Sequence, residues 1–262
     1  KGEFNNAGNI LGSERVSITG NDLNNSGSIA GGYVRMAAIR DINNKGGVIL
    51  GQTGVDLTAG RDINIESSTY TTSNQNGSQS SNRTDLGRRG VVMVTGGTGT
   101  LTLDAGNDVN LKAATVASEG TASIAAGNDV NIGGVTLTVD HETGNKGKNY
   151  IFHSESQDVG SQVYAAGNLC VSAGNNVSVE GSKVLSDSAI DIHAVGDISV
   201  TEGRSESFHE TTTYEKSSGF LSSKTKKTHE IMKDDLAIGS AISGTTINMD
   251  AGGHVAALGS PI

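Results

Sequence analysis

Apolar and polar residues alternate in short runs along most of the chain. Residues 101–105 read Leu-Thr-Leu-Asp-Ala, and Gly106 and Asn107 interrupt the alternation before it resumes at Val109. Strict alternation over a few residues is typical of a half-buried β-strand, and Gly and Asn tolerate the backbone angles of tight turns. No segment shows a helical period. The pattern predicts an all-β protein of short strands joined by tight turns.

The alternating pattern repeats at steps of 19 and 21 residues. Asn5, Asn24 and Asn43 each begin a copy of Asn-Asn-x-Gly, and residues 105–110 and 126–131 both read Ala-Gly-Asn-Asp-Val-Asn. Such a unit is too short for a strand–helix–strand crossover, which needs more than about 30 residues. One unit cannot bury its apolar edge, but stacked units can, because equivalent strands pair in parallel. The sequence therefore predicts a parallel β-helix, or β-solenoid.

This register makes specific demands on the repeated positions. Val109 and Val130 should lie in neighbouring layers with their side chains inward, and the repeated Asn residues should stack into an amide ladder. The Asp of the repeat, at the turn side, should accept backbone N–H bonds. The repeated segments predict about nine coils, which at ~4.8 Å per coil make a rod about 43 Å long.

Three polar segments interrupt the register. We expect a single β-helix over residues 1–262 with insertions at approximately 69–93, 138–160 and 203–234, which hold six of the nine aromatic residues. Insertions into a solenoid become side loops and often form its binding face. The third reads as a protruding β-hairpin around Ser218-Gly219. Its aromatic residues would either pin the hairpin to the rod or recognise a partner.

The candidate partner-binding residues therefore come from the second and third insertions. They are Tyr150, Phe152, Phe208, Tyr214, Phe220, Lys224, Lys226 and Lys227. Glu210, Glu215 and Glu230 offset the lysines, so a solvated face is expected there rather than an anion site.

Composition and charge exclude several classes of protein. The chain has 37 Gly, one Pro, no Trp and a net charge of −9, and only 34% of its residues are hydrophobic. A nucleic-acid binder would show a basic stripe, and no long one exists. No apolar run approaches the 18 residues of a membrane-spanning helix. The scarcity of aromatics fits a narrow core filled by Val, Ile, Leu and Ala.

No motif for catalysis or metal binding is visible. Cys170 is the only cysteine and aligns with outward positions, and the six histidines show no metal-binding spacing. We therefore predict a non-enzymatic protein with no catalytic, cofactor-binding or metal-binding residue. The alternative is a β-helical carbohydrate-active enzyme, a polysaccharide lyase or hydrolase. That enzyme would need two carboxylates about 5–9.5 Å apart in a groove, and the sequence alone identifies no such pair.

The repeats resemble a known family. Residues 1–65, with Asn-Asn-x-Gly-x-Ile and Ala-Gly-Arg-Asp-Ile-Asn-Ile, resemble the short repeats of filamentous haemagglutinin. Residues 100–262, with Ala-Gly-Asn-Asp-Val-Asn-Leu and a Ser/Lys-rich hairpin, resemble the haemagglutinin-repeat region of the same exoproteins. The resemblance implies a right-handed β-helical stalk of a large Gram-negative exoprotein that reaches the outer cell surface by two-partner secretion.

The resemblance also implies a role and a set of partners. Such exoproteins are adhesins with a part in virulence, or contact-dependent growth-inhibition effectors that carry a toxin to a neighbouring cell. The expected partners are the rest of the parent exoprotein and a host-cell or target-cell surface, through protein, glycan or outer membrane, with end-to-end association of rods as a further option. The repeat already runs at residue 1 and the sole proline is Pro261, so we expect a piece of a longer chain outside its export domain.

Overall fold

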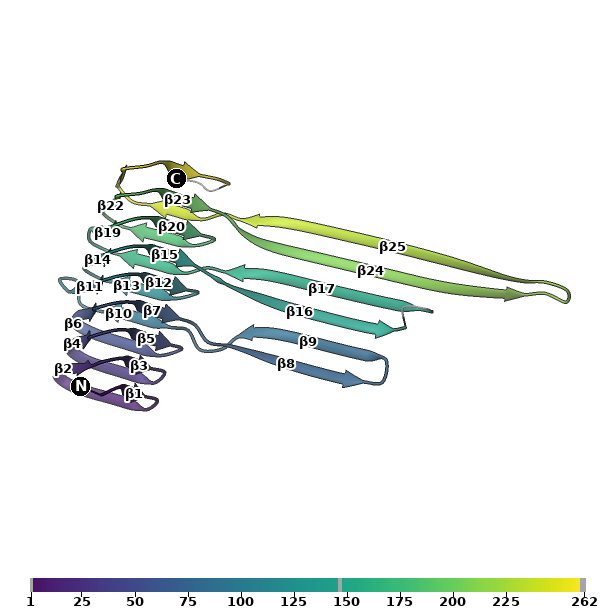
Figure 1. The fold of residues 1–262 in the computed structure, drawn as a ribbon, viewed down its shortest axis with the longest axis horizontal. Coiled ribbons are helices and arrows are strands. Elements are labelled where there is room, and N and C mark those ends of the chain that lie inside the picture. Colours follow the sequence, from purple (N-terminus) through teal and green to yellow (C-terminus); the bar gives the residue numbers. More distant parts are fainter. Residues whose placement is uncertain (1, 146–147, 260–262) are drawn as a thin grey trace.

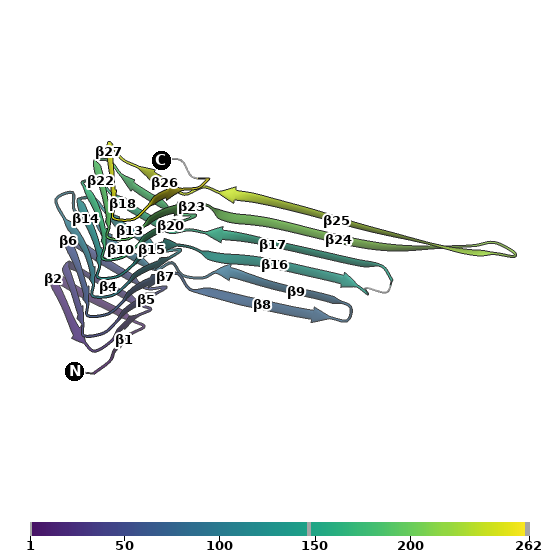
Figure 2. The same ribbon diagram turned by 45° about the horizontal axis from the view of Figure 1, so that its top comes forward.

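The computed structural model describes residues 2–145 and 148–259, and the regular structure of this part is β-strand throughout. Stacked coils form a rod, and three hairpins project from one side of it (Figures 1 and 2). The predicted all-β parallel β-helix is confirmed.

The first sheet of the rod contains one short strand from each coil. Its nine described strands pair in parallel, which agrees with the expected number of coils. In order they are β1 (Phe4–Asn6), β3 (Leu23–Asn25), β5 (Ile42–Lys45), β7 (Ile63–Glu66), β12 (Val109–Lys112), β15 (Val130–Gly133), β20 (Val177–Glu180), β23 (Ile198–Thr201) and β28 (Val255–Ala257).

The second sheet contains 13 described strands and completes each coil. Three long strands begin it, namely β2 (Asn9–Gly20), β4 (Ser28–Ala38) and β6 (Val48–Ala59). Later coils divide the same path into two strands: β10 (Val91–Val94) and β11 (Thr100–Ala105), β13 (Thr115–Ser118) and β14 (Thr121–Ala126), β18 (Gln162–Ala165) and β19 (Leu169–Ala173), β21 (Lys183–Ser186) and β22 (Ala189–Ala194), β26 (Ala241–Ser243) and β27 (Thr246–Ala251). The change occurs at β6, which pairs with β10 along its first half and with β11 along its second.

The third sheet is formed by the insertions and is antiparallel. Its strands are β8 (Thr69–Asn76), β9 (Gln79–Leu86), β16 (Val135–Gly144), β17 (Tyr150–Val159), β24 (Gly203–Ser218) and β25 (Ser223–Ile238). The inserted hairpins thus span 69–86, 135–159 and 203–238. Val91 and Val92 were expected inside the first insertion, but they belong to the rod because their strand pairs with β6. The second hairpin starts earlier than expected and the third ends later, because strand pairing continues to their bases.

The apolar core lies between the first and second sheets and follows the alternation of the sequence. Val109 is fully buried, and its strand places it between Ile63 and Val130 in the adjacent layers. The expected position of Val109 and Val130 in neighbouring layers is confirmed. Large aromatic side chains are absent from the buried core of the described coils.

Asparagine ladders follow two columns of the first sheet. In the outward column, Asn24 donates to Asn5 and Asn43 donates to Asn24, each with an Nδ2–Oδ1 distance of 2.9 Å. The same contact continues through Asn64, Asn110 and Asn131. The expected amide ladder is therefore present and is twice as long as the three residues that predicted it.

A second amide ladder lies inside the rod. Asn25 and Asn44 are buried, and Asn25 Nδ2 donates to Asn44 Oδ1 over 2.7 Å. Asn44 Nδ2 donates in turn to the carbonyl of Gly47 over 2.9 Å. In the next layer the column becomes apolar at Ile65. Each buried amide is stabilised because it finds a partner in its own coil or the next one.

The turn-side Asp residues form a third ladder. Asp129 accepts the backbone N–H of Asn176 and the side-chain amide of Asn175, both at 2.9 Å. The backbone contact recurs at Asp22, Asp41, Asp62, Asp108 and Asp197. Asn176 occupies the same slot and accepts the N–H of Asp197 at 2.8 Å. The slot therefore requires an acceptor oxygen and not a negative charge, as expected.

Donors around this ladder lower the pKa of three of its carboxylates. A side-chain hydrogen bond from Arg40 lowers the pKa of Asp22, and one from Arg61 lowers the pKa of Asp41. The backbone N–H of His254 lowers the pKa of Asp197. Charges of like sign in successive coils are thus each matched by a donor from the following coil.

The inward position of Val109 leads to the first prediction. Val109→Asp buries a charge without a partner and should destabilise the fold by at least about 3 kcal/mol. Ser178→Asp, on the outward side of the same sheet, should change stability by less than about 0.5 kcal/mol. Thermal unfolding followed by circular dichroism measures both. Equal stability of the two variants would contradict the inward assignment.

The Asp ladder leads to the second prediction. Asp129→Asn keeps an acceptor oxygen, as Asn176 does, and should change the free energy of unfolding by less than about 0.5 kcal/mol. Asp129→Ala leaves the N–H of Asn176 and the amide of Asn175 without this acceptor and should cost about 1–2 kcal/mol. Urea unfolding measures the difference. If both variants lose the same stability, charge and not hydrogen bonding governs the slot.

Candidate functional site

The three hairpins leave the rod at the same corner. They follow β7, β15 and β23 of the first sheet and return into β10, β18 and β26 of the second. The coils between them, which start with β12 and β20, carry no hairpin. They turn the corner through Ala113 and Gly181, whose φ angles are 50° and 53°. The hairpins therefore occur in alternate coils.

Hairpins that project from alternate coils are spaced so that neighbouring hairpins can pair through hydrogen bonds. Paired strands lie ≈ 4.7–4.9 Å apart, so a coil has the height of one strand and a hairpin has the width of two. Three hairpins in alternate coils thus fill the side of the rod without a gap. Accordingly β9 pairs with β16, and β17 pairs with β24, so that the insertions form one six-stranded sheet (Figure 1).

Buried serines hold the bases of the hairpins. Ser161 Oγ donates to the carbonyl of Gly133, and Ser240 Oγ donates to that of Thr201, both at 2.6 Å. Ser182, in a coil without a hairpin, links the two through its backbone N–H to Ser240 Oγ and its own Oγ, which accepts from the N–H of Ser161. This serine column fixes the bases of the second and third hairpins to the stacked coils.

The hairpin sheet is a single layer with both faces largely in solvent. Among the described residues of its strands, only Tyr150, Gly203 and Thr212 are buried. A sheet without an apolar layer gains little from burial, so its order depends on strand pairing and on the rod that holds its bases. The rod therefore acts as the scaffold, and the sheet is the surface that it presents.

Four of the candidate aromatics lie on one face of this sheet. Phe152 on β17 and Phe208 on β24 are in contact, with ring centroids 5.8 Å apart, and Tyr150 and Tyr214 share the face. Lys233 Nζ lies 5.3 Å from the centroid of Phe208. None of these four rings belongs to the apolar core of the rod. Phe152 and Phe208 pack the second hairpin against the third.

The remaining candidate residues lie at the free end of the third hairpin. The pairing of β24 with β17 stops at Thr212, and β24 and β25 continue alone as a two-stranded ribbon (Figures 1 and 2). Phe220 at the tip is 100% exposed and Leu221 is 93% exposed. Sequence reasoning missed Leu221, because a single aliphatic residue beside an aromatic carries no period.

Fewer glutamates lie beside the lysines of this ribbon than expected, so less of their positive charge is balanced. Glu215 faces Lys226 across the two strands. Glu210, in contrast, accepts a hydrogen bond from His229 at 2.9 Å if that ring nitrogen is protonated, and Glu230 faces Thr211 nearer the rod. Of the three expected partners, only Glu215 lies level with the lysines.

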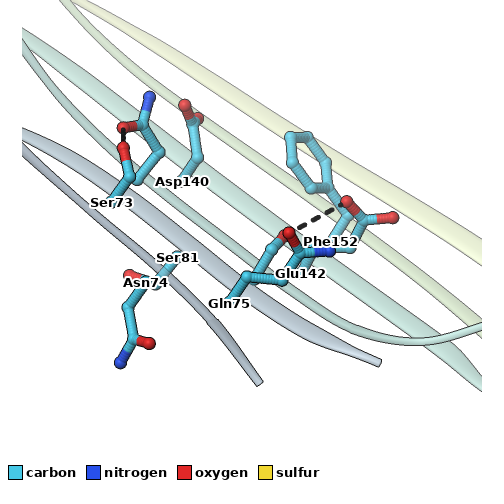
Figure 3. Close-up of a pocket in the computed structure, with 9 residues that line it drawn as sticks. Ser73, Asn74, Gln75, Ser81, Asp140, Glu142 and Phe152 are labelled. Carbon is cyan, nitrogen blue, oxygen red and sulfur yellow. Dashed lines mark hydrogen bonds between the residues drawn. The ribbon is translucent and has the colours of Figure 1, made fainter. Parts of the chain in front are cut away.

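A shallow pocket of about 450 Å³ lies between the first and second hairpins (Figure 3). Its polar lining includes Asn82, Asp140 and Glu142, and the ring of Phe152 closes one side. Ser154 Oγ donates to Asp140 over 2.6 Å, and Ser80 Oγ to Glu142 over 3.5 Å. Sequence reasoning missed both carboxylates, although Asp-x-Glu within an alternating run places them on one strand face.

Histidines line the opposite face of the sheet. His141, His153 and His209 face one another on β16, β17 and β24, and the rings of His153 and His209 lie 5.8 Å apart. The Nε2 atom of each ring lies within hydrogen-bond distance of a side chain two residues further along its own strand, such as Glu155 for His153. Within the described residues, His, Cys, Asp and Glu form no group of three or more that could hold a metal ion.

Cys170 has the outward position that alignment predicted. It faces Asp191 in the next coil, and its thiol is free and exposed. Partial burial, with a smaller effect of Asp191, raises the pKa of the thiol. A raised pKa lowers the thiolate fraction and with it the nucleophilicity of the group.

The fold and the site define a β-solenoid module with a lateral sheet of hairpins. A family model for the hemagglutinin repeat matches residues 12–158 and 143–232, and the chain belongs to this family. Membership indicates an adhesin-like structural module of a secreted or cell-surface exoprotein. No curated protein and no solved structure matches the chain. The described residues also contain no helix long and apolar enough to cross a membrane.

Proposed function

We propose that this chain is a non-enzymatic stalk segment that contacts another cell through its hairpin sheet. The parent exoprotein would lie on the outer surface of a Gram-negative bacterium after two-partner secretion. The observation that carries the proposal is the fusion of three hairpins, from alternate coils, into one sheet with both faces in solvent. A rod that served only as a spacer has no use for this surface.

The geometry of the corner supports this division of roles. The coils that contain β12 and β20 close with one left-handed residue and need no hairpin for their core. The hairpins are therefore additions to a complete rod. In an adhesin their contact would be with a host cell, and in a growth-inhibition effector with the bacterium that receives the toxin. The same surface serves either role, and the rest of the parent exoprotein decides between them.

The third prediction tests whether the rod and the contact surface are separable. Deleting residues 202–238 joins Thr201 to Gly239 and Ser240, which reproduces the Glu180-Gly181-Ser182 corner of the coil below. The variant should keep its circular dichroism and melt within about 5 °C of the parent chain. Its binding to target cells, measured by flow cytometry, should fall by about tenfold or more.

A matched deletion provides the control. Removing residues 134–159 joins Gly133 to Gly160 and Ser161 and restores the corner of the β12 coil in the same way. Loss of the folded rod in both variants would make the hairpins part of its scaffold. Retained folding with unchanged cell binding would place the contact on the coils.

The polar pocket favours a β-helical carbohydrate-active enzyme as the second candidate. Asp140 and Glu142 lie two residues apart on one face of β16, a Cα separation of about 6.8 Å. Side chains placed in this way can bring their carboxyl groups to a separation of about 5–9.5 Å, which glycoside hydrolases use. Phe152 and the amides of Asn82 and Gln75 would suit a sugar ring. Against this candidate, both carboxylates accept hydrogen bonds from serines, and the family is typically structural or adhesive.

The fourth prediction separates the two candidates. Incubation with a panel of neutral and acidic polysaccharides should release no reducing ends or unsaturated products above background. Asp140→Asn with Glu142→Gln should behave as the unmodified chain does, with equal melting temperatures. Product release that disappears in the double variant would establish the enzyme and overturn the non-enzymatic assignment.

A further inference from the structure

The free end of the third hairpin exposes two large apolar side chains that the molecule does not use. Phe220 and Leu221 lie between Gly219 and Ser222, whose backbone atoms close the turn with an N–O distance of 2.7 Å. They are the two most exposed large hydrophobic residues of the described chain. Beyond Thr212 the ribbon has no third strand beside it, and its end lies far from the rod (Figures 1 and 2).

The ribbon behind this tip is basic in an acidic protein. Residues 213–227 contain four lysines and one glutamate, a net charge of +3 within a chain of net charge −9. The strand register puts Lys224 and Lys226 on one face and Lys216 and Lys227 on the other. The apolar tip therefore has a collar of lysines on both sides. This symmetry suits contact along the axis of the ribbon, not contact through one of its faces.

The spacing between the apolar tip and the lysines matches the depth to which apolar side chains enter a membrane interface. Residues 217–223 carry no charge, and the lysines lie one to four residue pairs behind the last pair, Ser218 and Ser223. At about 3.4 Å per residue the charges thus begin a few ångströms behind the turn and extend for about 10 Å. Apolar side chains that bind a membrane interface enter it by ≈ 5–10 Å, and lysine stems reach toward the phosphates.

We propose that this tip docks end-on on an anionic phospholipid bilayer. Phe220 and Leu221 enter the interface between headgroups and acyl chains, and the four lysines lie at the level of the phosphates. The inference rests on the proposed contact function and names lipid as the partner at the end of the third hairpin. A protein pocket could hold the two apolar side chains, but it would not require lysines on both faces of the ribbon.

The fifth prediction uses the absence of Trp from the chain, because one introduced Trp is then the only such fluorophore. Vesicles of phosphatidylcholine with about 30% phosphatidylglycerol provide an anionic bilayer surface. On these vesicles the emission of the Phe220→Trp variant should shift to the blue and should be quenched by brominated acyl chains. Leu11→Trp, at a position of the rod that is 83% exposed, should do neither. Unchanged Phe220→Trp emission at saturating vesicle concentration overturns the proposal.

Vesicle flotation separates the two components of the contact. Phe220→Ser with Leu221→Ser should weaken binding at least about tenfold while melting is unchanged. Replacing the four lysines with Gln should weaken it about a hundredfold or more, because each lysine contributes roughly fivefold near an anionic surface, and should remove the salt dependence. Binding that is insensitive to either set of changes contradicts the proposal.

Failure of the lipid-docking inference can be distinguished from failure of the proposed contact function. If the 202–238 deletion loses cell binding but the unmodified chain does not bind anionic vesicles, the contact function stands and its partner is a protein or a glycan. If vesicles bind and cell binding is unaffected by the deletion, the tip is a lipid-binding element and the contact function is wrong.

Discussion

The spacing between hydrogen-bonded strands is the constraint on which the whole structure depends. Each coil adds the height of one strand to the rod, and each hairpin is two strands wide. Hairpins in every coil would collide, and hairpins in every third coil would leave unpaired edges between them. Insertion after β7, β15 and β23 meets the spacing at which the hairpins can pair into one continuous sheet. The lateral sheet is therefore a consequence of where along the rod the insertions occur.

Polar ladders make this narrow rod possible with few apolar residues. Stacked Asn, Asp and Ser side chains each bond to the equivalent residue or backbone group one coil away, as at Asn25, Asp129 and Ser182. Among the described residues no buried side-chain nitrogen or oxygen lacks a hydrogen-bond partner. Because successive coils offer matching donors and acceptors, the polar columns favour the same register as the apolar ones do.

Much of the rod could be predicted from sequence, since a period of 19 or 21 residues fixes which side chains face each other. Val109 above Val130 and the Asn5 column follow directly from that count. The inner position of Asn25 and Asn44 did not, because an amide and an aliphatic side chain occupy the same inward column. The joining of the hairpins was also missed: it depends on counting hairpin-free coils between insertions, and the inserted segments share no repeat. Leu221 carries no period at all, and Asp140 and Glu142 alternate along one strand but lie in an inserted segment outside the 19- or 21-residue repeat.

The long third hairpin determines how the module can meet a surface. Strands of the hairpin sheet run away from the rod, whereas the sheet itself grows along the rod axis (Figure 1). Because β24 and β25 reach beyond Thr212 and the other hairpins do not, a flat surface approached from this side meets Phe220 and Leu221 first. The rod would then lie alongside that surface. Under the contact function that we propose, the rod is therefore held parallel to the neighbouring cell.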